Sequence, residues 1–119
     1  MKKTLIIGAS TNPDRYSYKA ALKLRKYGHD IVNIGLKKGE VAGVEIEKIG
    51  DIHQDIDTIT LYVSANNQKS FYDYILATNP KRIIFNPGTE NPELVGLAEK
   101  LGILTDNSCT LVLLSTGQY

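Results

Sequence analysis

The residues with the clearest chemical potential lie in one stretch near the N-terminus, LIIGASTNPDRYS at positions 5–17. Gly8 permits a sharp backbone turn, the hydroxyl of Ser10 can donate a hydrogen bond, and Arg15 can form a bidentate pair with phosphate oxygens. A helix that begins near Ser17 points its unpaired N–H groups and its positive dipole end back at this turn. The stretch therefore predicts a phosphate-binding loop, made of Gly8, Ala9, Ser10, Asn12, Pro13 and Arg15.

Two interpretations of this loop stay open at this point. It could be only a tight strand-to-helix turn, in which Ser10 or Asn12 caps the helix and Arg15 lies in solvent.

Beside this loop, Tyr16 and Tyr18 could stack on an adenine ring. Tyr18 can equally pack in the core, whereas Tyr16 precedes the helix, so Tyr16 is the better candidate for ligand binding.

The end of the second apolar run indicates which nucleotide would bind. An NAD site has an acidic residue there for the ribose 2′-hydroxyl. The residues after Asn33 read Ile-Gly-Leu-Lys-Lys-Gly, with no acid before Glu40. Lys37 and Lys38 favour a ribose that carries a phosphate, as in NADP or coenzyme A. The alternative is that the two lysines form a solvated turn.

The remaining reactive side chains predict neither a catalytic residue nor a metal site. Because His29, His53 and Cys109 are the only His and Cys residues in the chain, no Cys/His set has zinc-site spacing. Cys109 could be a nucleophile, but no histidine is near it in sequence, so we interpret it as a small structural residue, buried or half-buried. Glu90 could act as a general base, but its surroundings favour a turn ahead of a helix.

Composition excludes several other classes of function. Fourteen Lys and Arg against thirteen Asp and Glu give a net charge of +1, which argues against nonspecific nucleic-acid binding. No apolar run approaches the roughly 20 residues of a membrane span, and the run Leu5–Ile7 is too short for the core of a secretory signal. The single cysteine suits a reducing cytoplasm. A length of 119 residues suits one domain over residues 1–119.

Short runs of aliphatic and β-branched residues recur along the chain and predict strands. Runs that are almost continuously apolar are typical of parallel strands buried on both faces. The run Thr58–Val63 alternates in part, which predicts a place nearer the edge of the sheet. The predicted strands are Thr4–Ile7, Asp30–Ile34, Thr58–Val63, Arg82–Phe85 and Ile103–Thr105.

Segments with helical spacing lie between these runs. Residues Gly35–Asp57 are the least regular part, with a predicted short strand at Val44–Ile46 and a short helix near Asp51. The apolar residues Leu111–Leu114 are either a last core segment or a cover for a neighbouring subunit. The predicted helices are about Ser17–Tyr27, about Asn66–Thr78, and a last one that opens with Asn91-Pro92-Glu93.

This alternation predicts an α/β fold of the Rossmann-like type, with three α/β/α layers around a mostly parallel sheet of five or six strands. Ligands of such folds bind at the carboxyl ends of the strands, where the strand order reverses. The loops that follow the strands are therefore the expected place for binding residues.

Over nearly its whole length the chain resembles the small stand-alone CoA-binding family, whose fold is similar to the CoA-binding domain of the succinyl-CoA ligase alpha subunit. The motifs that carry the resemblance are, in order, Gly8-Ala-Ser-x-Asn-Pro-x-Arg-x-Ser, Gly28, Gly43, Asp57, Leu61-Tyr62-Val63, Asn86-Pro87-Gly88, Gly102-Ile103 and Asn107-Ser108-Cys109. The resemblance implies that the Gly8–Arg15 loop holds the pyrophosphate of the ligand. It also implies an adenosine contact after the second strand and a border of the pantetheine arm, at Asn33, Lys37 and Lys38 and at Tyr62, Val63 and Ser64 respectively.

Two departures from the family pattern bear on function. The family follows its second strand with Val-Asn-Pro, whereas this chain keeps Asn33 and has Ile34 in place of the proline. The histidine that becomes phosphorylated in the ligase has no counterpart after Asn107. The resemblance therefore does not extend to ligase activity by this chain alone.

The sequence thus predicts a module that binds coenzyme A or an acyl-CoA and is not catalytic by itself. The alternative from the enzyme class is an NADP-dependent oxidoreductase or a subunit of an acyl-CoA enzyme, although no Tyr-x-x-x-Lys or comparable acid/base pair stands on a predicted helix. A third hypothesis is an interaction protein with a vestigial pocket. A homo-oligomer or a protein partner stays open, and no nucleic-acid or membrane partner is expected.

Overall fold

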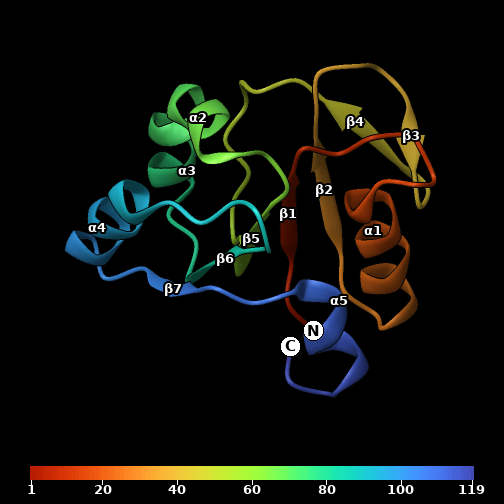
Figure 1. Ribbon diagram of the computed structural model, residues 1–119. Helices are drawn as coiled ribbons and strands as arrows, with labels where there is room; N and C mark the ends of the chain where they lie inside the picture. The colour runs from red at the N-terminus through yellow and green to blue at the C-terminus, as the bar shows by residue number, and fades with distance from the viewer.

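The computed structural model describes residues 1–119 and is built on a seven-stranded sheet (Figure 1). The spatial order is β3-β4-β2-β1-β5-β6-β7, and every neighbouring pair is parallel except β3 and β4. The chain leaves β1 first to one side and then, from β5 on, to the other, so the order reverses at β1. The strands are β1 Thr4–Ile7, β2 Ile31–Ile34, β3 Glu40–Val41, β4 Val44–Glu47, β5 Thr58–Leu61, β6 Arg82–Phe85 and β7 Leu104–Asp106.

Helices cover both faces of this sheet, as Figure 1 shows. Helices α1 and α5 pack against each other on one face, and α3 and α4 lie on the other. The predicted Rossmann-like α/β class is therefore confirmed. The sheet has seven strands because β3 and β4 add a hairpin at one edge. The helices are α1 Tyr16–Lys26, α2 Ala65–Gln68, the 3₁₀ turn η1 Lys69–Phe71, α3 Tyr72–Thr78, α4 Pro92–Lys100 and α5 Thr110–Ser115.

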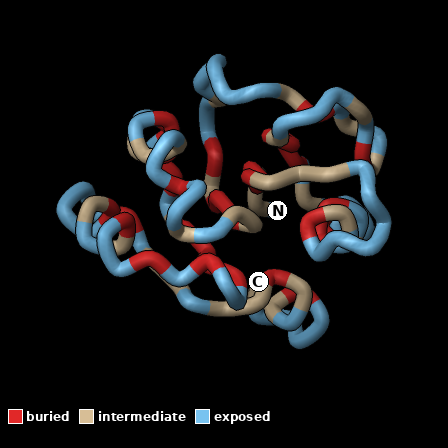
Figure 2. The backbone as a smooth tube through the Cα atoms, turned by 45° about the horizontal axis from the view of Figure 1, so that its top comes forward, coloured by how far each residue is buried: buried red, intermediate tan, exposed pale blue.

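The strands are buried on both faces, which explains their nearly continuous apolar sequences. In β1, Leu5 and Ile7 face the cluster under α3 and α4, whereas Ile6 faces the smaller cluster under α1 and α5. Figure 2 shows buried backbone at the centre of the molecule and exposed segments on the outer turns of the helices. The core thus holds the carboxyl ends of β1, β2 and β5 at fixed positions.

The predicted edge position of Thr58–Val63 is wrong. The strand β5 lies between β1 and β6, and all four of its residues are buried. The threonines that produced the alternation are paired: Thr60 Oγ1 bonds to Thr110 Oγ1 at 2.8 Å and accepts from Asn86 Nδ2 at 2.6 Å. Because buried hydroxyls with partners cost little, polar residues here do not mark an exposed face.

Several other predicted elements differ in detail. No helix forms near Asp51, where the chain runs in bends to Asp57. The predicted helix Asn66–Thr78 is divided into α2, η1 and α3. The apolar run Leu111–Leu114 lies in α5, packs on α1 and buries Leu114, so it is the last core segment of this chain. No helix of the structure combines the length and the apolar character that crossing a membrane requires.

Candidate binding site at the carboxyl edge of the sheet

The turn after β1 is held by close backbone packing. Gly8 has a φ of +98°, and a Cβ added there would stand 2.9 Å from the carbonyl oxygen of Tyr62. A Cβ added to Gly35, after β2, would stand 2.4 Å from the carbonyl oxygen of Ala9. Glycine is therefore required on both sides of the loop, which lies wedged between the ends of β2 and β5.

Some backbone N–H groups of this loop are hydrogen-bonded within the chain, and others are free. The N–H groups of Gly8 and Ala9 both donate to the carbonyl of Ile34 at 2.9 Å, so they serve the fold. The N–H groups of Ser10 and Thr11 donate to no other group of the chain. These two amides are therefore the loop donors that remain for an anionic ligand.

The start of α1 is also open. Its N-cap residue Arg15 is extended, makes no side-chain cap, and no acidic residue stands in the first turn. At α4, by contrast, the side chain of Asn91 accepts from the N–H of Leu94, and Glu93 lies in the first turn. The first turn of α1 thus has neither a side-chain cap nor an acidic residue, whereas the equivalent end of α4 has both.

A groove of about 790 Å³ runs along this edge of the sheet; we call it the carboxyl-edge groove, formed by residues within 8–17, 35–49, 62–71 and 87–89. Its volume lies in the usual range for small-molecule sites. Arg15 and Lys37 are the only charged side chains that line it. Burial raises the pKa of Tyr62 well above its usual 10.0, which keeps that phenol neutral. The groove therefore presents positive charge and no carboxylate.

Nine of the predicted binding residues line this groove: Gly8, Ala9, Ser10, Arg15, Tyr16, Lys37, Tyr62, Val63 and Ser64. Tyr16 is 67% exposed and lies under the ammonium of Lys19, 5.4 Å from the ring centroid. Its ring is therefore accessible at the mouth of the groove.

Four predicted residues do not line the groove: Asn12, Pro13, Asn33 and Lys38. Asn12 shapes the loop, because its Oδ1 accepts from the N–H of Asp14 at 3.0 Å. Asn33 is fully buried and donates through Nδ2 to the carbonyls of Val41 and Val44 at 3.2 and 3.1 Å. The side chain of Asn33 thus fixes the β3–β4 hairpin, which carries one wall of the groove.

The structure adds lining residues that the motifs did not single out. Leu36, Ile46 and Ile49 form an apolar wall at the β2–β4 end, and Asn67, Ser70 and Phe71 line the opposite end. Leu36 is 85% exposed. An apolar residue directly before two lysines was the available signal for Leu36; nothing in the sequence marks the residues of α2 and η1.

The other reactive side chains lie outside the groove lining. Cys109 is half-buried at the N-cap of α5, as its interpretation as a structural residue predicts. Glu90 accepts from the N–H of Gly88 at 3.0 Å, within the predicted turn. No group of three His, Cys, Asp or Glu side chains is arranged to hold a metal ion.

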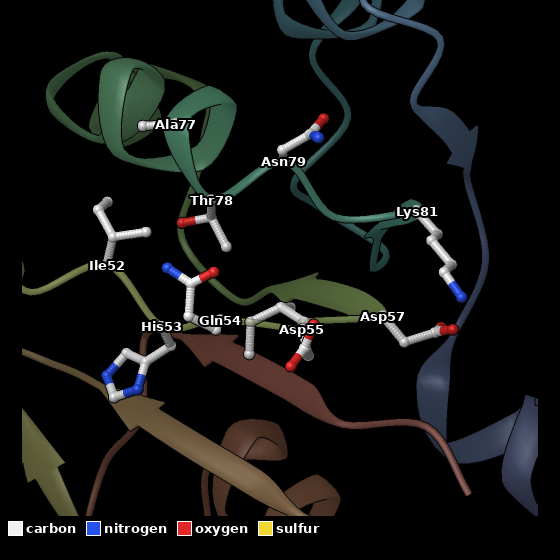
Figure 3. A pocket seen from close by; sticks show the side chains of 10 residues that line it. Ile52, His53, Gln54, Asp55, Asp57, Ala77, Thr78, Asn79 and Lys81 are labelled. Atoms are coloured by element: carbon white, nitrogen blue, oxygen red, sulfur yellow. The ribbon is translucent and has the colours of Figure 1, made fainter.

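A second cavity, of about 480 Å³, lies at the opposite edge of the sheet, between residues 52–57 and 77–81 (Figure 3). We call it the amino-edge cavity. Asp55, Asp57 and Lys81 line it, and Figure 3 shows the Lys81 ammonium pointing toward the carboxylate of Asp57. His53, at its rim, contacts Glu47 at 3.0 Å. The helix that borders this cavity, α3, presents its C-terminal end, which carries partial negative charge.

The groove at the reversal of strand order, next to an open helix start, defines a Rossmann-like α/β binding domain. Within that class, the chain belongs to the family described as CoA binding domain, which matches residues 2–115. Among curated proteins, no match is found.

Solved structures share this fold over almost the whole chain. One, described as an uncharacterized protein, is 49% identical with a TM-score of 0.97, covering 100% of this chain and 98% of its own. A hypothetical protein from Pyrococcus horikoshii OT3 is 26% identical with a TM-score of 0.83, over 93% of this chain and 80% of its own. A Thermus thermophilus protein, cell-free ID.343, is 18% identical with a TM-score of 0.87, over 99% and 90%.

Proposed function

We propose that this protein binds coenzyme A or a coenzyme A thioester in the carboxyl-edge groove, as a binding module without catalysis of its own. Membership of the CoA binding domain family supports the ligand class. The observation that carries the proposal is the open start of α1, with Arg15 as its N-cap residue, in a groove that holds no carboxylate. A pyrophosphate would bring two negative charges to this positively charged site.

The strand order supports one orientation of the ligand. Because β1 lies between β2 and β5, its loop is at the middle of the groove, and the loop after β2 and the start of α2 are at the two ends. With the pyrophosphate at Ser10 and Arg15, the adenosine end lies beside Leu36 and Lys37, where the ammonium meets the 3′-phosphate. The pantetheine arm then passes Tyr62, Val63 and Ser64.

The groove lining supports a binding module rather than an enzyme. Its ionisable side chains are Arg15, Lys37 and two tyrosines, and burial keeps Tyr62 neutral. General acid–base catalysis uses groups that titrate near the working pH. The lining holds no His, Cys, Asp or Glu side chain, so we expect the reaction of a bound thioester to require a group from a partner.

Calorimetric titration of the purified protein with CoA, acetyl-CoA, 3′-dephospho-CoA, NADP and NAD, at one moderate salt concentration, tests the proposal. We expect CoA to bind, 3′-dephospho-CoA to bind more weakly, and NAD not to bind. A preference for NADP would support the oxidoreductase alternative, since Lys37 could equally meet a 2′-phosphate. If none of the five ligands produces heat, the proposal is overturned. The hypothesis of an interaction protein with a vestigial pocket would then be favoured.

A further inference from the structure

One side chain at the β5–β6 end of the groove makes an unusual set of contacts. Gln68, the last residue of α2, is fully buried. Its Nε2 donates to the carbonyl of Val63 at 2.9 Å and to the carbonyl of Thr89 at 2.7 Å. Val63 and Thr89 follow β5 and β6 and both line the groove. The Gln68 amide therefore fixes the distance between the two strand ends that form this part of the wall.

A chain of hydrogen bonds supports Gln68 from behind. Its Oε1 accepts from Asn91 Nδ2 at 2.8 Å, and the same Asn91 amide donates to the Tyr72 hydroxyl at 2.8 Å. That hydroxyl donates to Glu93 at 2.9 Å. Both N–H groups and the oxygen of Gln68 are thus used, and a satisfied buried network of this kind is rigid. Gln68 does not itself line the groove, so this network lies behind the part of the wall that Val63 and Thr89 form.

The groove lining at this end carries no charged side chain, and it includes the exposed polar residues Asn67 and Ser70. Asn67 Nδ2 donates to Ser64 Oγ at 3.1 Å, which leaves Asn67 Oδ1 without a partner. The exposed hydroxyl of Ser70 makes no hydrogen bond within the chain. Phe71, also in the lining, turns part of its ring into the core cluster. A ligand group here meets the Ser70 hydroxyl and the Asn67 amide oxygen, both on exposed residues, beside the half-buried ring of Phe71.

Resting on the proposed coenzyme A site, we propose that Gln68 is a positioning residue that fixes the wall at this end of the groove, so that the site selects free coenzyme A or a short acyl-CoA with a polar acyl group over a long alkyl acyl-CoA. In an apolar tunnel, each buried methylene would raise affinity about fourfold. At a polar, exposed end, added methylenes extend into water, whereas a hydroxyl on the acyl group can pair with Asn67 or Ser70.

Titration with a matched set of thioesters tests the selectivity. The probes are CoA, butyryl-CoA, 3-hydroxybutyryl-CoA and octanoyl-CoA. We expect octanoyl-CoA to bind no more tightly than butyryl-CoA and 3-hydroxybutyryl-CoA to bind severalfold more tightly. Affinity that rises with chain length while CoA itself binds would overturn this inference and leave the proposed function intact. Failure of CoA to bind would overturn both.

The variant Gln68→Met tests the positioning role, because methionine has a similar length but no N–H donor. We expect binding of 3-hydroxybutyryl-CoA to weaken about tenfold, while 3′,5′-ADP, which occupies only the nucleotide half, binds as before. Equal weakening of both ligands would assign Gln68 a merely structural role. Thr78→Val is the matched control, since it removes a buried hydroxyl bonded to Tyr74 at the other edge of the molecule.

A second variant keeps the inference testable if Gln68→Met does not fold. Ser70→Val changes an exposed lining residue and leaves the Gln68 network untouched. We expect it to reduce the preference for 3-hydroxybutyryl-CoA over butyryl-CoA, and the double variant Asn67→Leu/Ser70→Val to abolish it, because both polar partners are then absent. A preference that persists in the double variant contradicts the polar end of the groove.

Discussion

Two cavities at opposite edges of one sheet differ in charge. The carboxyl-edge groove has the open start of α1 and two cationic side chains, Arg15 and Lys37. The amino-edge cavity has the C-terminal end of α3, the carboxylates of Asp55 and Asp57, and one balancing lysine, Lys81. An anionic ligand is therefore favoured at one edge and disfavoured at the other.

The difference comes largely from topology. In a parallel sheet, each helix that follows a strand starts at the carboxyl edge and ends at the amino edge, so the helix dipoles give the two edges opposite potentials. The local sequence then decides which helix start stays available. Asn91 and Glu93 satisfy α4, whereas α1 has neither a side-chain cap nor an acid. Of the two longest helices, α1 and α4, only α1 thus keeps an open start, next to the loop after β1.

The largest expected contrast comes from two glycines with similar positive φ angles. In Gly8→Ala the new methyl group would stand 2.9 Å from Tyr62 O, whereas in Gly28→Ala nothing lies within 4 Å. We expect Gly8→Ala to weaken CoA binding about 100-fold and to lower the free energy of unfolding by about 2–4 kcal/mol. Gly28→Ala, at the amino edge, should cost about 1–2 kcal/mol of stability and leave affinity unchanged. Calorimetry measures the CoA affinity of the two variants, and urea unfolding measures their stability. Equal losses of affinity in the two variants would contradict the contrast.

The next contrast compares two arginines at the ends of α1. Arg15 lines the groove, whereas Arg25 is exposed and lies 3.7 Å from Asp30. Arg15→Ala should weaken CoA binding by about 1.5–3 kcal/mol, the range of a charged hydrogen bond, and reduce its dependence on NaCl. Arg25→Ala should change neither quantity. An unchanged affinity in Arg15→Ala would remove the phosphate loop from the proposal.

A smaller effect separates neighbouring lysines. Lys37 lines the groove and Lys38 does not. Lys37→Ala should weaken CoA binding about three- to fivefold, as expected for an exposed charge pair, and should not affect 3′-dephospho-CoA. Lys38→Ala should have less effect on CoA. If both ligands weaken alike in Lys37→Ala, then the lysine does not contact the 3′-phosphate.

The smallest effect concerns pH and belongs to the amino edge. His29 accepts the N–H of Lys2 at 2.9 Å and packs edge-on against Tyr119. Burial, followed by nearby positive charges including Lys2, lowers its pKa below 6.5. The unfolded chain therefore binds a proton more readily, and the free energy of unfolding should fall as pH falls through 6.5 toward the lowered pKa.

The variant His29→Asn should remove the fall in the free energy of unfolding that His29 causes below pH 6.5. Above pH 6.5 this group contributes no pH dependence in either protein. Urea unfolding across that range measures the effect. CoA affinity should not change, because His29 lies at the edge opposite the groove. A change in affinity with unchanged pH dependence would contradict the division between the two edges.

The sequence alone was sufficient for the class of fold and for the position of the loop after β1, whose binding of phosphate stays a prediction. Continuous apolar runs, the capped start at Asn91 and the spacing from Gly8 to Arg15 are local patterns, each fixed by backbone geometry or by helix-end chemistry. The same patterns failed for Thr58–Val63, because buried hydrogen bonds from Thr110 and Asn86 make its threonines compatible with the centre of the sheet.

Only the tertiary structure decided which residues meet in the groove. It removed Asn33 and Lys38 from the lining and brought in Ile49 and Asn67, which are distant from the β1 loop in sequence. It also joined Gln68 to Thr89 across 21 residues. Side chains of this kind carry no local signal, because their role depends on which strand ends become neighbours, and that is set by the packing of the whole sheet.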